Sequence, residues 1–212
     1  MKVQILIDNP SSWMFDFKDE LEILLKEEGH NVLVIDSHKK ISSGDILFLL
    51  SCEEKLVDFD LNTHNLVIHA SDLPKGKGWS PLTWQVLSGA NSIPVVIFEA
   101  DHKIDNGPIY NRVLVSLDGT ELLDELRLKM FEAIKKLIIN FIKLYPNNKG
   151  IDQKGESTFY KKRTKDDSEL DVNEPLKAQF NKLRVVDNDR YPAYFIYKSK
   201  KYIIKVYPDK NE

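Results

Sequence analysis

The amino-acid sequence predicts an α/β fold in which the short strands of a parallel sheet alternate with helices. Runs of apolar and β-branched residues recur along the first half of the chain, and stretches with a helical spacing of apolar residues follow several of them. Parallel strands need long crossover connections, so this alternation is typical of a parallel sheet covered by helices. With 42% hydrophobic residues, the 212-residue chain can bury a sizeable core.

The expected strands are short and apolar, as buried parallel strands are. They lie at residues 2–7, 32–35, 45–50, 65–68, 94–98 and 109–115. A helix follows the first strand, because Phe17, Leu21 and Leu25 recur at helical spacing before a stop at Gly29. A second, short helix is expected over residues 80–89, with serine as its N-cap and proline as its first helical residue.

The second half of the chain predicts one long helix and then a polar segment. The helix is expected over residues 121–144, with an apolar stripe of Leu123, Leu126, Met130, Ile134, Leu137 and Phe141. From Pro146 the chain is polar, although the residues Thr158-Phe159-Tyr160 indicate that part of it is pinned to the body. A short helix is then expected at residues 176–183, with strands at 183–186, 193–197 and 202–207.

These patterns divide the chain into three parts. The catalytic core is expected to cover residues 1–145, a polar connecting segment residues 146–175, and a small appendage of one helix and β-strands residues 176–212. The hairpins of the appendage carry more apolar surface than one small hairpin can hide, which makes a homodimer one expected arrangement.

Charge and cysteine content indicate the compartment and the class of partner. The 30 basic residues against 33 acidic ones give a net charge of −3, which offers no basic surface for nucleic acid. Cys52 is the only cysteine, so no internal disulfide forms, and this fits a reducing compartment. The apolar run at the N-terminus is too short for a signal peptide or a membrane span. We therefore expect a soluble, cytoplasmic protein that binds neither nucleic acid nor membranes.

Two polar residues follow neighbouring apolar strands. His69 ends the strand that contains residues 66–68, and Asp105 lies in the loop after the strand at 94–98. In a parallel α/β sheet, reactive groups collect outside the carboxyl ends of the strands. The sequence therefore predicts a general base, His69, oriented by a carboxylate, Asp105.

The segments Val67-Ile-His-Ala-Ser-Asp-Leu-Pro74 and Asp105-Asn-Gly107 resemble the signature of the folate-dependent formyltransferases. That signature is Asn-x-His-x-Ser-Leu-Leu-Pro followed by Asp-x-Gly, and the resemblance covers residues 45–115 well. It implies a Rossmann-like parallel-sheet formyltransferase core and N10-formyltetrahydrofolate as the cofactor. It also implies that His69 accepts the proton of the attacking amine while Asp105 stabilises the imidazolium.

The chain departs from the family signature at Val67, which stands where the family has asparagine. A valine side chain cannot donate a hydrogen bond to an oxyanion. Asn65 points to the same side of the strand but lies one residue pair upstream, about 6–7 Å away. We expect His69 and a backbone amide to serve the oxyanion, with Asn65 as the weaker candidate.

The resemblance places the folate in two loops that contact the pterin largely through backbone groups. The expected cofactor-binding residues are Leu50, Ser51, Cys52, Leu73, Phe98, Glu99, Ala100 and Asp101. A nicotinamide dinucleotide is not expected, because residues 8–12 contain no glycine fingerprint. The histidines at positions 30, 38, 64 and 102 show no metal-ligand spacing with acids or Cys52, so no metal is predicted.

The acceptor follows from the branch of the family that the chain resembles. The tail and residues 163–164 resemble the small sugar N-formyltransferases, which act on UDP- or dTDP-linked 4-amino-4,6-dideoxy sugars for surface polysaccharides or pseudaminic-acid routes. Methionyl-tRNA is disfavoured, because the chain is acidic and ends about a hundred residues after the motif. A glycinamide ribonucleotide formyltransferase-like enzyme and a catalytically degenerate folate-binding module remain alternatives. The expected substrate-binding residues are Asn9, Lys75, Lys77, Trp79, Tyr110, Arg163, Asn188 and Tyr191.

The Lys75-Gly-Lys-Gly78 run has two interpretations. As a mobile loop it either lies in solvent, or it brings a lysine to a nucleotide diphosphate. It is not a P-loop, since it lacks the Gly-Lys-Thr ending.

Overall fold

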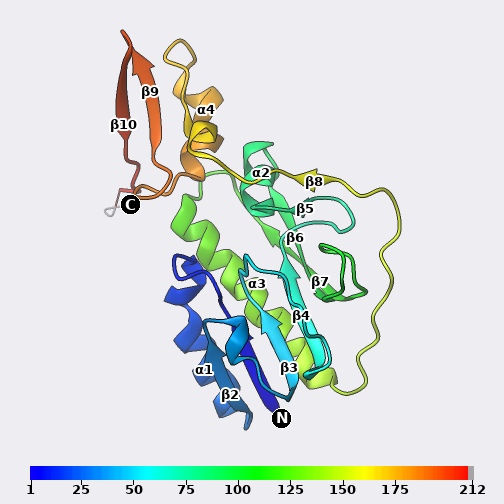
Figure 1. Cartoon of the computed structure of the whole chain (residues 1–212). Coiled ribbons are helices and arrows are strands. Elements are labelled where there is room, and N and C mark those ends of the chain that lie inside the picture. The colour runs from blue at the N-terminus through cyan, green and yellow to red at the C-terminus, as the bar shows by residue number, and fades with distance from the viewer. Residues whose placement is uncertain (210–212) are drawn as a thin grey trace.

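The computed structural model describes residues 1–209, and a six-stranded sheet forms its centre (Figure 1). From one edge to the other the strands are β2 (Asn31–Ile35), β1 (Lys2–Leu6), β3 (Gly44–Leu49), β4 (Asn62–His69), β6 (Ser92–Glu99) and β7 (Ile109–Ser116). The predicted α/β fold with a mostly parallel sheet is thus confirmed.

The sheet is not parallel throughout. The strands β2, β1, β3 and β4 run in one direction, but β6 pairs antiparallel with β4, and β7 pairs antiparallel with β6. The only helix in the connection between β4 and β6 is the seven-residue α2 (Pro81–Leu87). Such a helix spans about 10 Å, whereas an eight-residue strand spans about 26 Å. The chain therefore turns back at the end of the sheet where β4 finishes, and β6 runs antiparallel to β4. The expectation of a parallel β6 is wrong.

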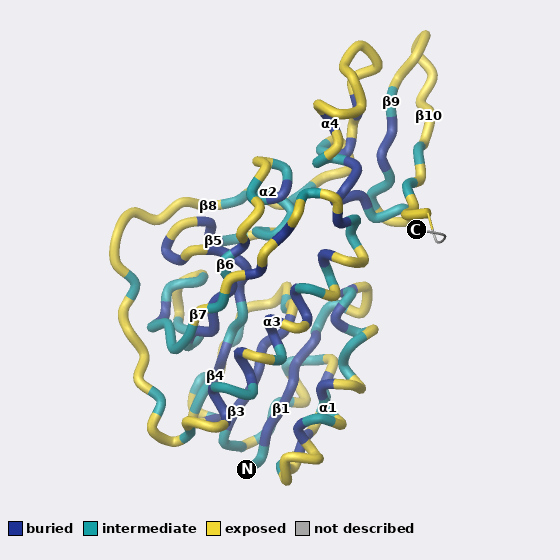
Figure 2. Tube along the Cα trace, turned by 180° about the vertical axis from the view of Figure 1, so that it is seen from behind, coloured by how far each residue is buried: buried dark blue, intermediate teal, exposed yellow. Residues whose placement is uncertain are grey.

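Two helices cover one face of the sheet. Helix α1 (Lys18–Glu27) ends before Gly29, which has a φ of +83°, and helix α3 (Leu123–Leu144) crosses behind the strands. Both helices share one apolar core with alternate residues of the strands (Figure 2). The predicted stripe on α3 is buried from Leu126 to Phe141, and only Leu123 is half-buried. The opposite face of the sheet carries a smaller apolar cluster of Leu6, Ile35, Leu47 and Leu49.

The connecting segment and the tail contain short elements. The strand β5 (Lys77–Gly78) pairs in parallel with β8 (Phe159–Tyr160), and 3-10 helices form at Trp13–Asp16, His38–Lys40 and Lys165–Ser168. Helix α4 (Leu176–Arg184) precedes a hairpin of β9 (Ala193–Tyr197) and β10 (Lys200–Ile204). The division of the chain into three parts stays a prediction, and residues 210–212 of the expected appendage lie outside the described residues.

Three local expectations are wrong. Residues 183–186 do not form a strand, because α4 continues to Arg184, and the hairpin partner of β9 is β10. The last strand ends at Ile204 rather than at residue 207. Ser80 has a left-handed backbone, and its side chain makes no capping hydrogen bond to α2.

No helix within residues 1–209 is both long enough and apolar enough to cross a membrane.

A buried ion pair fixes helix α4 to the start of α3. Arg184 is 1% exposed, and its Nη2 lies 2.9 Å from Oε2 of Glu121, which is 3% exposed. Burial by itself raises the pKa of Glu121. Hydrogen bonds from Lys129 and from the backbone N–H groups of Asp118 and Gly119 outweigh it, and they lower the pKa from 4.5 to about 2.

We predict that Arg184→Met lowers the free energy of unfolding by about 3 kcal/mol, because it removes the buried one of the two cations that pair with Glu121 and leaves the carboxylate only the more exposed Lys129. The carboxylate has a depressed pKa in the folded state, so its contribution is present above the unfolded pKa and is lost as pH falls from about 4.5 to 2. Urea unfolding at pH 7 and across this acid range measures both effects. A wild-type stability for Arg184→Met would contradict the prediction.

Candidate active site

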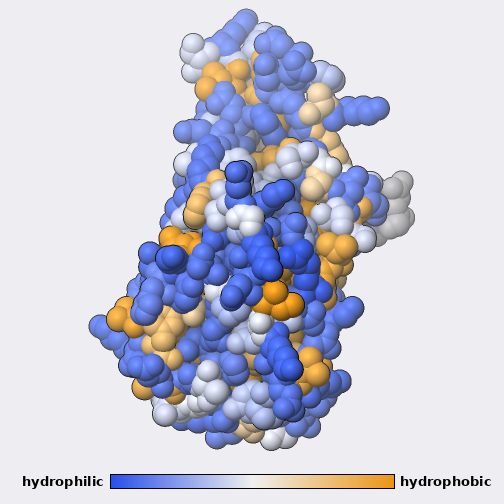
Figure 3. Space-filling view, turned by 90° about the vertical axis from the view of Figure 1, so that its right-hand side faces the viewer, coloured by the Kyte–Doolittle hydropathy of each residue, from blue (hydrophilic) through white to orange (hydrophobic). Residues whose placement is uncertain are grey.

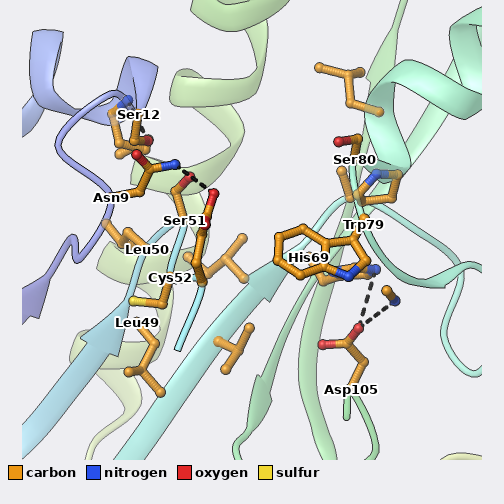
Figure 4. Close-up of a pocket in the computed structure, with 18 of the residues that line it drawn as sticks. Asn9, Ser12, Leu49, Leu50, Ser51, Cys52, His69, Trp79, Ser80 and Asp105 are labelled. Atoms are coloured by element: carbon orange, nitrogen blue, oxygen red, sulfur yellow. Dashed lines mark hydrogen bonds and ion pairs between the residues drawn. The ribbon is translucent and has the colours of Figure 1, made fainter. Parts of the chain in front are cut away.

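A cavity of about 620 Å³ opens beside the carboxyl ends of β1, β3 and β4. Its walls come from the loops after these strands, the loop after β6, the start of α3, and the residues at 162–163 and 187–191. Figure 4 shows Leu50 and Ser51 on one side of the cavity and His69 with Asp105 on the other. A volume of this size fits a small organic ligand.

His69 ends β4 and lines the cavity, although its side chain is only 8% exposed. Its Nε2 lies 2.8 Å from the carbonyl oxygen of Gly76 and 3.8 Å from Oδ2 of Asp105. A carbonyl oxygen can only accept a hydrogen bond, so Nε2 carries the proton of the neutral ring. Nδ1 is then the nitrogen that can accept a proton.

Asp105 reaches His69 by a route that the sequence did not indicate. Strand β6 is antiparallel, so its carboxyl end at Glu99 lies opposite Leu66, away from the end of β4. The loop after β6 runs back to His69, and Asp105 itself has a φ of +48°. Oδ2 of Asp105 accepts a hydrogen bond of 2.7 Å from the backbone N–H of Gly78. His69 and Asp105 lie close together as expected. The expected reason, that both follow the carboxyl ends of parallel strands, is wrong.

Most residues expected to bind the cofactor line the cavity. Those that do are Leu50, Ser51, Cys52, Phe98, Ala100 and Asp101. Leu73 is buried beneath the site against Val96 and Phe98. Glu99 points to the helical face of the sheet, where it accepts hydrogen bonds from Tyr110 Oη at 2.9 Å and from the backbone N–H of Asn65.

Half of the residues expected to bind the substrate line the cavity. Those that do are Asn9, Trp79, Arg163 and Tyr191. Lys75 is exposed elsewhere, and Lys77 is 4% exposed with its Nζ 3.1 Å from Oδ1 of Asn106. Tyr110 binds Glu99, and Asn188 exchanges hydrogen bonds with the backbone of Val206. The expected mobile loop is thus wrong at Lys77 and Gly78, which form strand β5.

Asn65 lies beneath the site rather than in it. Its side chain is 3% exposed, and Nδ2 donates to the carbonyl oxygen of Phe59 at 2.9 Å. Val67 occupies the cavity wall instead. These contacts give Asn65 a structural role, and the prediction that it faces the site is wrong.

Lys162 and Arg190 are cations of the cavity that were not identified from the sequence, whereas Arg163 was expected there. Lys162 lies over the ring of Trp79, with Nζ 4.3 Å from the centroid, and its Nζ is 3.7 Å from Oε2 of Glu53. The guanidinium groups of Arg163 and Arg190 lie 5.5 and 5.8 Å from the ring of Tyr191. The only available sequence signal is that basic residues stand beside aromatic ones in the polar tail.

The spacing of residues in the sequence did not indicate one group of possible metal ligands. Ligand atoms of Asp8, His38 and Cys52 lie within 4.8 Å of one another. Hydrogen bonds account for this arrangement, because Asp8 accepts from His38 at 3.1 Å and from two backbone N–H groups, and Cys52 donates to Leu6. Burial raises the pKa of Cys52 to about 12, which favours the thiol over the thiolate that binds metals.

No family model matches the chain. In sequence it is 32% identical over 120 residues to a methionyl-tRNA formyltransferase of Thermosipho melanesiensis, covering 57% of this chain and 39% of that protein. It is 29% identical over 174 residues to a methionyl-tRNA formyltransferase of Thermotoga sp. strain RQ2, covering 81% and 52%. The chain thus spans about half, or less, of the length of these curated relatives.

Solved structures show the same fold at low sequence identity. A methionyl-tRNA formyltransferase from Clostridium thermocellum gives a TM-score of 0.80 at 21% identity, over 100% of this chain and 94% of that chain. A 4-N formyltransferase from Francisella tularensis gives 0.66 at 19%, over 99% and 98%. HypX from Aquifex aeolicus in complex with tetrahydrofolic acid gives 0.76 at 17%, over 97% and 37%. The chain therefore has the same fold as these formyltransferase structures.

Proposed function

We propose that the protein transfers a formyl group from N10-formyltetrahydrofolate to the amine of a nucleotide-linked 4-amino-4,6-dideoxy sugar. The observation that carries the proposal is a single cavity with the His69–Asp105 pair in one wall and an aromatic, cationic rim above it. The resemblance of the motifs to folate-dependent formyltransferases supports the donor. The likeness of the fold to a 4-N formyltransferase supports the acceptor class.

The inner half of the cavity suits a reduced pterin. The apolar residues Leu49, Val67 and Phe98 line it, together with residues 50–54 and 100–104 of the two neighbouring loops. A flat heteroaromatic ring with polar edges fits such a slot, because the side chains bury its faces while backbone groups can bind its edges. When bound, N10-formyltetrahydrofolate would supply the formyl carbon. The complex of HypX with tetrahydrofolic acid is in line with this choice.

The outer half of the cavity suits a nucleotide diphosphate. Trp79 and Tyr191 offer ring faces on which a base can stack, and Lys162 and Arg190 lie beside those rings. Phosphate groups bind such cations by charge-assisted hydrogen bonds. Lys162 is free to do so, because its present ionic contact with Glu53 is 3.7 Å long and exposed.

The geometry of His69 supports general-base catalysis. Nε2 is engaged by Gly76 and faces Asp105, so Nδ1 takes the proton that the attacking amine loses. The carboxylate of Asp105 then stabilises the imidazolium at Nε2. The same imidazolium can return a proton to the departing amine nitrogen of the donor.

Methionyl-tRNA is the second candidate acceptor, because the curated relatives above are methionyl-tRNA formyltransferases.

Dimerisation through the C-terminal hairpin stays a prediction. The hairpin exposes the apolar side chains of Ile196 and Ile203, which are 48% and 61% exposed.

The proposal is tested by measuring tetrahydrofolate release from N10-formyltetrahydrofolate with four acceptors. These are UDP- and dTDP-linked 4-amino-4,6-dideoxy sugars, glycinamide ribonucleotide and methionyl-tRNA. We expect turnover with one of the sugar nucleotides only. Turnover with methionyl-tRNA or glycinamide ribonucleotide would identify that molecule as the acceptor and contradict the proposed sugar. Folate binding without any turnover would indicate a catalytically degenerate folate-binding module.

We predict that His69→Asn lowers kcat by about 100-fold or more, because general-base catalysis supplies about that factor. Folate affinity should stay close to the wild-type value, since the ring of His69 lies at the edge of the folate slot. Steady-state kinetics and titration of folate binding measure the two quantities. Near-normal turnover in the variant would show that His69 is not the base.

We predict that Lys162→Gln raises KM for the nucleotide sugar by about tenfold, because a charge-assisted hydrogen bond contributes about 1.5 kcal/mol or more. The value of kcat should change little, since Lys162 lies at the rim and away from His69. Lys161→Gln is the matched control, because Lys161 binds Asp167 outside the cavity at 2.7 Å. Equal KM values in both variants would exclude a phosphate contact at Lys162.

A further inference from the structure

The side chains of His69 and Asp105 are both held by one short piece of backbone, at residues 76–78. The carbonyl oxygen of Gly76 binds His69 at 2.8 Å, and the N–H of Gly78 binds Asp105 at 2.7 Å. The 3.8 Å separation of the pair therefore depends on where this backbone lies.

Residues 76–78 are positioned by the polar segment and not by the central sheet. We call residues 151–160 the strap, because they run along the outside of the molecule from the end of α3 to strand β5 (Figure 1). Oγ1 of Thr158 accepts a hydrogen bond of 2.8 Å from the N–H of Gly76, and the carbonyl oxygen of Thr158 accepts one of 2.9 Å from the N–H of Lys77. Strand β8 of the strap pairs with β5.

The two glycines of the Lys-Gly-Lys-Gly run are required by the strap. Gly76 and Gly78 have φ angles of +74° and +93°, which L side chains rarely adopt. A Cβ on Gly76 would lie 2.7 Å from the ring of Tyr160, and one on Gly78 would lie 2.8 Å from the carbonyl oxygen of Tyr160. The run is therefore built for close contact with the strap.

The strap also holds the loop that carries Asp105. Nε2 of Gln153 donates to the carbonyl oxygens of Asp105 and Gly107, each at 3.0 Å. Ile151 and Ile109 exchange two backbone hydrogen bonds, of 2.8 and 2.9 Å. One continuous segment thus binds both halves of the pair, through Gln153 on one side and Thr158 on the other.

We infer that Gln153 and Thr158 are positioning residues that set the spacing between His69 and Asp105. This inference rests on the proposed role of His69 as general base. Neither residue lines the cavity, so neither is placed to contact a folate or a nucleotide sugar bound there. The surface on the side of the strap is mainly hydrophilic (Figure 3), and Thr158 is itself exposed. The strap therefore buries little apolar surface there, and its polar contacts with the two loops are its main feature.

The first test compares Gln153→Met and Thr158→Val with the wild type. Displacing catalytic groups by about 1 Å can cost about 100-fold, so we expect kcat to fall by about tenfold or more. KM for the folate should stay within a factor of about two, because the cavity wall is intact.

Matched variants separate positioning from a general effect on folding. Thr158→Ser keeps the hydroxyl and should restore kcat, whereas Ser157→Val, on the exposed neighbour, should leave kcat unchanged. A wild-type kcat in Thr158→Val and Gln153→Met, whatever their Tm, would overturn the inference.

Amide hydrogen exchange gives a readout that needs no acceptor. Thr158→Val should speed exchange at Gly76, and Gln153→Met should speed exchange at Gly78, whose N–H binds Asp105. Unchanged exchange at both glycines would overturn the inference even if formyl transfer is confirmed. Faster exchange in a protein that transfers no formyl group would support positioning and refute the proposed function.

Discussion

The backbone of residues 76–78 is the constraint on which the site depends, because it contacts both candidate catalytic side chains. A carbonyl and an N–H group two residues apart point to the imidazole and to the carboxylate. Backbone groups cannot change rotamer, so they hold the ring of His69 and fix the nitrogen that carries its proton. Glycine at positions 76 and 78 is the condition for this geometry, since a side chain would collide with Tyr160.

The reversal of β6 determines how the carboxylate reaches the histidine. An antiparallel β6 ends away from His69, so the following loop must run back along it. Gly107 makes this return feasible, because a Cβ there would collide with the carbonyl group of Glu99. Glu99 in turn binds Tyr110 and the backbone of Asn65 on the helical face. The loop is therefore anchored on both faces of the sheet, and the pair can be held without help from a ligand.

The cavity joins two environments that suit the two halves of one reaction. Its lining includes the apolar residues Leu49, Val67 and Phe98 and also the ring of Trp79, whereas Tyr191 and the cations Lys162 and Arg190 come from the C-terminal half of the chain. The His69–Asp105 pair lies in the wall of the same cavity. Arg184, buried against Glu121, fixes helix α4 to α3 and so places the tail that supplies Tyr191 and Arg190 to this rim.

The sequence by itself determined the six strands of the central sheet, the four α-helices and the candidate pair. Apolar runs and the stripe on α3 report burial directly, and the motifs at His69 and Asp105 are local in the chain. Only the tertiary structure decided the direction of β6 and the positions of Asn65 and Lys77 outside the cavity. It also decided that residues 151–160 bind the loops of both His69 and Asp105. Strand direction depends on whether the helix in a connection is long enough to run back along the sheet, and α2 has only seven residues. The strap is polar, and its contacts join residues about 80 positions apart, so no local periodicity records them.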